Sequence, residues 1–135
     1  MRVAWGIMGD SRGHLTRALA LLPELSGHEF LFLGGGCVAE LRGQGMRVHD
    51  LPMPGTALSG GRVRGGATAV NFLRAVLDAP RTLGRLRRVL EDFRPDLAVT
   101  DYEFFLPRAA RTLGLPCLSL DHQHVLTKCR LAPPP

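Results

Sequence analysis

The sequence predicts a three-layer α/β/α domain built on a doubly wound, Rossmann-like parallel sheet with strand order 3-2-1-4-5. Short apolar runs alternate along the chain with segments of helical periodicity, which is typical of βαβ units. The first run, residues 2–8, is almost wholly apolar, as in strands that are covered on both faces of a parallel sheet. The length of 135 residues fits one domain, predicted to span residues 1–130.

Five segments have the composition of strands. They span residues 2–8, 29–34, 46–52, 96–100 and 116–120. The segments between them predict four helices. These span residues 13–25, 37–44, 67–93 and 103–113. Ser11 is the predicted N-cap of the first helix and Pro23 marks its end. Pro80 predicts a break in the third helix, the fourth is expected to begin near Pro107, and residues 53–66 are expected to form a glycine-rich polar loop.

The predicted strand order brings the carboxyl ends of strands one, four and five together, and the ligand site of such a sheet lies beyond these ends. Three loops leave them: residues 9–14 (GDSRGH), residues 100–104 (TDYEF) and residues 121–124 (DHQH). The side chains with the most evident chemistry fall on these loops. The sequence therefore predicts one site built from all three.

The first of these loops matches neither of two common nucleotide-binding fingerprints. Its glycines are spaced G-x-x-G-x-x-x-G from Gly6 to Gly13, and the second strand ends in three glycines where a dinucleotide site has an acidic residue. The lysine and hydroxyl of a P-loop are also missing. A dinucleotide-dependent hydride-transfer enzyme and a P-loop protein are therefore disfavoured.

Five residues of this loop are candidates for substrate binding: Gly9, Asp10, Ser11, Arg12 and Gly13. The glycines let the backbone approach a ligand, and the following helix offers its N-terminal amides to an anion. Alternatively, the glycines serve only the turn.

His14 and Asp101 are the candidate catalytic pair. A histidine at a loop-to-helix junction acts as a general base if a carboxylate orients it. Asp101 ends the fourth predicted strand, which should neighbour the first. Alternatively, His14 caps the helix or faces solvent.

Glu103, Asp121, Gln123 and His124 are further candidates for substrate contact at the same edge. The D-x-E pattern that ends at Glu103 and the H-x-H pattern that ends at His124 each lack a third metal ligand. We therefore predict no metal site and no cofactor. The three cysteines have no C-x-x-C spacing, so neither a zinc site nor a disulfide framework is indicated.

Arginine dominates the charge of the chain. The formal net charge is +5, and every cationic side chain except Lys128 is an arginine, which suits bidentate contact with phosphate. Arg62 and Arg64 either grip a phosphate or lie in a solvated loop. Four arginines of the third helix either form a solvated face or contact an anionic membrane surface. These are Arg81, Arg85, Arg87 and Arg88. Few aromatic residues and no reading-head motif accompany these charges, so nucleic acid is not expected as a partner.

No apolar run approaches the roughly 20 residues of a membrane-spanning helix, and the apolar run of residues 2–8 is too short for a signal peptide. We therefore expect a cytoplasmic protein, with peripheral contact at the inner face of the membrane as the more specific option.

Two blocks of the sequence resemble one enzyme family. GIMGDSRGHLTRALALLPEL, residues 6–25, looks like the first β-loop-α unit of GT-B glycosyltransferases, in which a glycine-rich loop leads into a helix that begins at a histidine. PDLAVTDYEFFLPRAARTLGLPCLSLDHQH, residues 95–124, is similar to a block of the bacterial and archaeal branch related to the lipid-linked N-acetylglucosaminyltransferase of peptidoglycan synthesis. The resemblance covers essentially the whole chain.

This resemblance implies the acceptor-binding N-terminal domain of a two-domain, metal-independent enzyme. The missing C-terminal domain would hold most contacts to a nucleotide-sugar donor, and the acceptor would be a saccharide or a lipid-linked molecule. The family's catalytic histidine matches His14, and its orienting aspartate matches Asp101. The loop departs from the family's G-G-x-G-G-H pattern at Asp10 and Arg12, so the acceptor is expected to differ.

The chain is shorter than such an enzyme, and we expect residues 131–135 (LAPPP) to be a linker or a cut end. The expected function is that of an acceptor-binding half, inactive in sugar transfer alone. Two alternatives stay open. One is a non-catalytic subunit that recruits or anchors a donor-binding partner, and the other is a stand-alone nucleotide- or phosphate-binding regulator.

Overall fold

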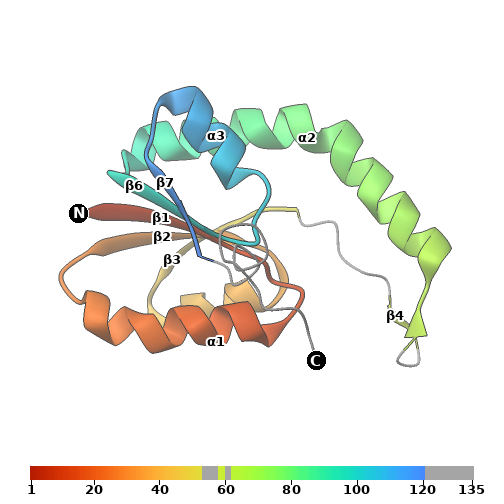
Figure 1. The fold of residues 1–135 in the computed structure, drawn as a ribbon, viewed down its shortest axis with the longest axis horizontal. Coiled ribbons are helices and arrows are strands. Elements are labelled where there is room, and N and C mark those ends of the chain that lie inside the picture. The colour runs from red at the N-terminus through yellow and green to blue at the C-terminus, as the bar shows by residue number, and fades with distance from the viewer. Residues whose placement is uncertain (53–57, 60–61, 121–135) are drawn as a thin grey trace, which may run out of the picture.

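A computed structural model describes residues 1–52, 58–59 and 62–120 of the chain (Figure 1). Five parallel strands form its main sheet in the order β3-β2-β1-β6-β7. They are β1 (Arg2–Ile7), β2 (Glu29–Gly34), β3 (Arg47–Asp50), β6 (Leu97–Asp101) and β7 (Cys117–Ser119). This order confirms the predicted 3-2-1-4-5 topology and the α/β class.

Helices cover both faces of this sheet (Figure 1). One face packs on α1 (Arg12–Leu21) and the 3₁₀ helix η2 (Gly36–Gln44), and the other on α2 (Gly65–Phe93) and α3 (Leu106–Leu113). The side chains of β1 alternate between the two cores: Trp5 and Ile7 lie in the first, and Ala4 lies in the second. A strand that is buried on both faces is therefore the centre of the predicted three-layer domain.

The other elements differ in detail from the prediction. The expected helix over residues 37–44 is the 3₁₀ helix η2, and residues 53–66 contain the short antiparallel strands β4 (Leu58–Ser59) and β5 (Arg62–Val63). Helix α1 ends before Pro23, which lies in a second 3₁₀ helix, η1 (Leu22–Leu25). Ser11 is the N-cap residue of α1, although its side chain makes no capping hydrogen bond.

The predicted break at Pro80 is wrong, because α2 is continuous from Gly65 to Phe93. Proline removes one backbone hydrogen bond and crowds the preceding turn, which bends a helix but need not end it. Figure 1 shows this bend partway along α2, and the first half of the helix extends away from the sheet. The buried side chains of α2 all follow the proline: they are Thr82, Leu86, Leu90 and Phe93.

The loops after β1 and β2 cross with their backbones in contact. A Cβ atom at Gly9 would overlap the carbonyl oxygen of Gly35, and one at Gly36 would overlap the carbonyl oxygen of Gly9. The amide of Cys37 donates to that same Gly9 carbonyl at 3.2 Å. The structure thus gives Gly9 a packing role, whereas Gly13 stands in the first turn of α1 with open space around it.

These two glycines supply a matched pair of variants. Gly9→Ala should lower the free energy of unfolding by about 1–3 kcal/mol, because a backbone carbonyl must move to admit the methyl group. Gly13→Ala should leave stability unchanged or raise it by up to about 1 kcal/mol, since alanine favours the helix. Urea titration of both variants measures this contrast, and equal effects at the two positions would contradict it.

Candidate active site

The site is built where the end of β6 meets the start of α1. Ile7 pairs with Asp101 in the sheet, and the amide of Met8 donates to the Asp101 carbonyl at 2.9 Å. The chain then passes through the glycine crossing into α1, whose first turn carries His14. Two segments that are 87 positions apart in sequence thereby place their polar side chains together.

His14 and Asp101 form a direct contact. His14 Nδ1 lies 2.7 Å from Asp101 Oδ1; the aspartate side chain is fully buried and the histidine side chain is 16% exposed. An ionised carboxylate only accepts hydrogen bonds, so Nδ1 carries the hydrogen and Nε2 keeps its lone pair. The arrangement fixes one tautomer of a neutral imidazole, which is the form that a general base requires.

The Tyr102 ring packs against the imidazole of His14. Its ring centroid lies 5.4 Å from that of His14, and its backbone adopts φ = 63°, in the left-handed region that side chains other than glycine rarely enter. The hydroxyl of Thr100 donates to the Glu103 carbonyl at 2.8 Å and closes this turn. Sequence reasoning gave Tyr102 no role, and no motif signalled its unusual backbone.

Arg17 is a further residue that the sequence analysis missed. Its Nη1 atom donates to Asp101 Oδ1 at 3.1 Å and to the Leu120 carbonyl at 3.0 Å. The signal for it was the spacing, because residues three apart in a helix share a face and Arg17 follows His14 by three positions. Among the residues that the structure describes, no donor reaches the second carboxylate oxygen of Asp101.

Glu103 lies away from this pair. Its side chain packs near Gly6 and Leu106, on the α3 side of the sheet, whereas Asp101 faces α1. The amides of Phe105 and Leu106 donate to its two oxygens at 2.7 and 2.5 Å. Burial raises the pKa of the Glu103 carboxyl, and these amide hydrogen bonds oppose that rise. The geometry therefore gives Glu103 the task of satisfying the first amides of α3.

The remaining predicted residues are spread around the edge. Asp10 and Ser11 are exposed, and Arg12 is exposed with its guanidinium 2.6 Å from the Glu40 carboxylate. Arg64 is the exposed residue that precedes α2. The Arg62 side chain and residues 121–124, with Asp121, Gln123 and His124, lie outside the described part of the chain. Within that part, no group of three or more His, Cys, Asp or Glu residues could hold a metal ion.

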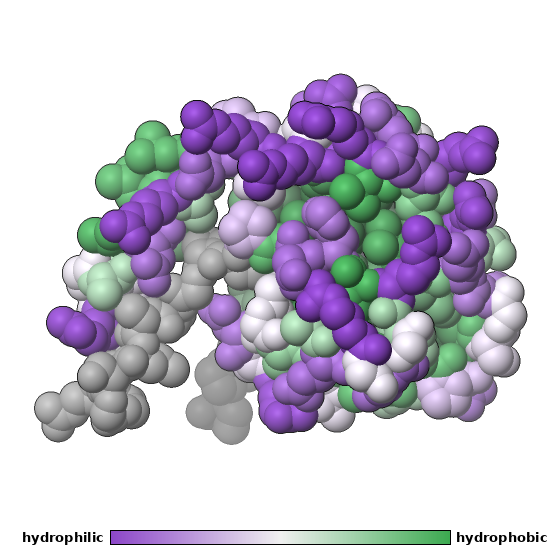
Figure 2. All heavy atoms as spheres, turned by 180° about the vertical axis from the view of Figure 1, so that it is seen from behind, coloured by the Kyte–Doolittle hydropathy of each residue, from purple (hydrophilic) through white to green (hydrophobic). Residues whose placement is uncertain are grey.

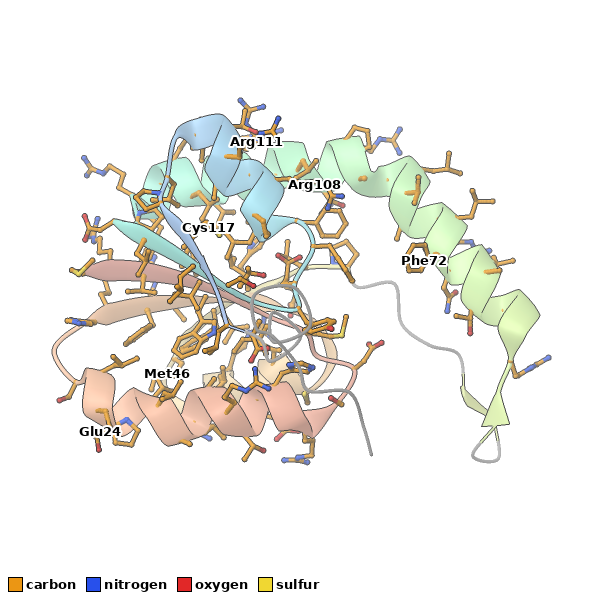
Figure 3. The ribbon with its side chains drawn as sticks, viewed as in Figure 1. Glu24, Met46, Phe72, Arg108, Arg111 and Cys117 are labelled. Carbon is orange, nitrogen blue, oxygen red and sulfur yellow. The ribbon has the colours of Figure 1, made fainter. Side chains whose placement is uncertain are left out.

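An apolar groove lies between the bent helix and α3. It has a volume of about 290 Å³ and is lined by side chains that include Phe72 and Val76 from α2, Phe104 from the turn before α3, and Arg108 from α3. Figure 3 shows Phe72 and Arg108 on these two elements. Phe72, Val76 and Phe104 are all exposed. The groove presents an apolar surface with Arg108 at its border.

Comparisons with known proteins identify the family of this chain. The sequence model of glycosyl transferase family 1 matches residues 1–135. The chain belongs to this family. An uncharacterized glycosyltransferase of Methanosarcina mazei is 31% identical over 132 residues, which cover 91% of this chain and 33% of that protein. The chain thus spans about a third of the length of the curated relatives that it matches.

Solved structures of glycosyltransferases share the fold. The glycotransferase of kitacinnamycin matches with a TM-score of 0.58 and 27% identity, over 87% of this chain and 29% of that one. MurG of Acinetobacter baumannii matches with a TM-score of 0.61 and 15% identity, over 88% of this chain and 33% of that one. The second likeness concerns the fold alone.

The buried Glu103 makes stability depend on pH. Its folded-state pKa lies above the ordinary value of 4.5, so in the range just above 4.5 the folded protein keeps a proton that the unfolded chain has lost. The contribution of Glu103 to the free energy of unfolding therefore falls as pH rises, by at most about 1.4 kcal/mol per pH unit.

Glu103→Gln has no such proton to lose, and the stability of the wild type should decline relative to that of this variant as pH increases through that range. Urea unfolding at a series of pH values measures the difference. The exposed Glu24, labelled in Figure 3, supplies the control variant Glu24→Gln. A wild-type curve parallel to that of Glu103→Gln would contradict the prediction.

Proposed function

We propose that the chain is the acceptor-binding half of a metal-independent glycosyltransferase, in which His14 is the general base and Asp101 orients it. The contact of 2.7 Å between them carries this proposal. The carboxylate is fully buried, the imidazole retains access to solvent, and the pair lies at the carboxyl end of the sheet, where ligands of such folds bind. Membership of a glycosyltransferase family supplies the reaction class.

In the proposed reaction His14 Nε2 takes the proton of an acceptor hydroxyl. The oxygen then forms a bond to the anomeric carbon of the sugar, and the bond from that carbon to the nucleotide diphosphate breaks. The buried carboxylate of Asp101 stabilises the imidazolium that results. The proton leaves His14 to solvent after transfer, which its partial exposure permits.

The donor is proposed to be a nucleotide sugar held mainly by a second domain. The length of the relatives supports this, because the chain covers a third of each curated one. The likeness of residues 6–25 and 95–124 to the lipid-linked N-acetylglucosaminyltransferase branch supports a place near that branch. For the acceptor we propose a saccharide or lipid-linked molecule with an apolar portion, since the groove beside α2 is lined by Phe72, Val76 and Phe104.

The catalytic proposal is tested in the full-length protein with a panel of nucleotide-sugar donors. His14→Ala and Asp101→Asn should each lower kcat/KM by about 100-fold or more, the usual contribution of a positioned general base. His28→Ala is the matched control, because this exposed histidine precedes β2 at the opposite edge of the sheet. Wild-type rates in both site variants would remove the assignment, and sugar transfer by the purified 135-residue chain would refute its dependence on a second domain.

A membrane contact is a second, independent proposal. Arg81, Arg85, Arg87 and Arg88 are exposed on the second half of α2, and Val70, Leu73 and Leu77 are exposed on its first half, with Leu77 70% exposed. Figure 2 shows hydrophilic side chains along this helix layer and apolar ones over the first half of α2. No helix within the described residues is long and apolar enough to cross a bilayer. A basic face beside apolar side chains suits peripheral binding to anionic lipid.

Reversal of three of these charges tests that contact. Arg85, Arg87 and Arg88 changed together to Glu should weaken binding to vesicles of anionic phosphatidylserine by roughly 100-fold, because each arginine contributes about 1 kcal/mol near such a surface. Sedimentation with vesicles measures the loss, and neutral phosphatidylcholine vesicles are the control. Unchanged binding would refute the contact.

A further inference from the structure

We infer that Arg17 is a positioning residue for the His14–Asp101 pair, and that its charge sets the pH at which His14 works. The inference rests on the proposed role of His14. It begins from one atom, since Asp101 Oδ1 accepts hydrogen bonds from both His14 Nδ1 at 2.7 Å and Arg17 Nη1 at 3.1 Å. Two donors of different charge thus share one buried acceptor.

The first reason is the cost of burying a carboxylate. The Asp101 side chain has no exposure to solvent, and an isolated buried charge is strongly unfavourable unless it is paired. A neutral His14 offers a hydrogen bond and no net charge, so it cannot supply that pairing while it acts as a base. Arg17 is always protonated, so it pairs the buried carboxylate with a cation while His14 is neutral.

The second reason is the geometry of the guanidinium. The same Nη1 atom donates to the Leu120 carbonyl at 3.0 Å. Arg17 thus joins α1 to the ends of β6 and β7, and its side chain is only 31% exposed. A group tied at two points keeps a fixed place beside Asp101. Its charge therefore acts on the pair at constant distance.

The consequence concerns proton affinity at His14. The carboxylate favours the imidazolium, and a cation on the same oxygen weakens that preference. Within the described residues, the Tyr102 ring also lies against His14, and the exposed Asp10 and Arg12 precede it in the sequence. Arg17 is the cation that touches the carboxylate itself. Its removal should make His14 take up a proton at higher pH, which converts the base into its inactive form.

Three variants in the full-length protein separate charge from structure. Arg17→Met removes both charge and hydrogen bonds, Arg17→Gln keeps a donor without the charge, and Arg17→Lys keeps the charge. The acid limb of the kcat/KM profile should move up by about one pH unit in the Met and Gln variants and stay near the wild-type position in Lys. Arg42→Met is the matched control. Arg42, on η2, also pairs with an aspartate, at 2.7 Å, but that partner is the exposed Asp50 of β3.

A second readout does not depend on activity. NMR of ¹³C-labelled histidine, with the His14 signal assigned through His14→Gln, follows the ring as pH changes. The pH midpoint of the His14 signal should rise in Arg17→Gln and stay unchanged in Arg17→Lys. If Arg17→Met does not fold, the comparison is made between the Gln and Lys variants. If the variants lose rate equally at every pH, and neither the acid limb of the kcat/KM profile nor the NMR midpoint of His14 moves, Arg17 has only a structural role and the inference is overturned. A shifted midpoint in a protein whose His14→Ala variant keeps full activity would instead refute the proposed function alone.

Discussion

The burial of one negative charge constrains the centre of this molecule. Asp101 ends a strand in the middle of the sheet, its side chain has no contact with solvent, and a single oxygen receives both His14 and Arg17. Removing a carboxylate from water is costly enough that its partners must be present and aligned in the folded state. Helix α1 brings both of these partners to Asp101, and the Leu120 carbonyl after β7 accepts a second hydrogen bond from the same Arg17 guanidinium.

The alignment depends in turn on backbone that has no side chains in the way. In the loops after β1 and β2, the Gly35 carbonyl lies against Gly9 and the Gly9 carbonyl lies against Gly36. This contact determines where α1 can start. A strained Tyr102 completes the same edge from the β6 side. Strained backbone persists where the surrounding structure holds it in place, and such positions gather at functional sites. The glycine crossing and the strained turn thus place the imidazole between a fixed carboxylate and a fixed ring.

The sequence predicted the layers, the strand order and the pairing of His14 with Asp101, because each depends on periodicity and on the rule that parallel strands end at a common edge. The break at Pro80 was wrong because a proline within a helix can bend it without ending it, and the sequence pattern does not tell these two outcomes apart. Glu103 was predicted to contact substrate from its place on the loop after the fourth predicted strand. Only the folded structure shows that Asp101 and Glu103, two positions apart, lie on opposite sides of the sheet. Arg17 was missed because its spacing of three from His14 places it on the same helix face but does not tell a solvated charge from one that reaches a buried partner.

The two halves of helix α2 differ in how they pack. All its buried side chains follow Pro80, so the second half anchors the helix to the sheet, while the first half contributes surface and little core. Substitutions in the first half therefore change what the domain presents beside its groove without much effect on folding. A helix divided in this way gives a lineage freedom to explore new partners on one half while selection preserves the scaffold through the other. The bend at the proline marks the border between the part of α2 that is constrained by stability and the part that is free to diverge.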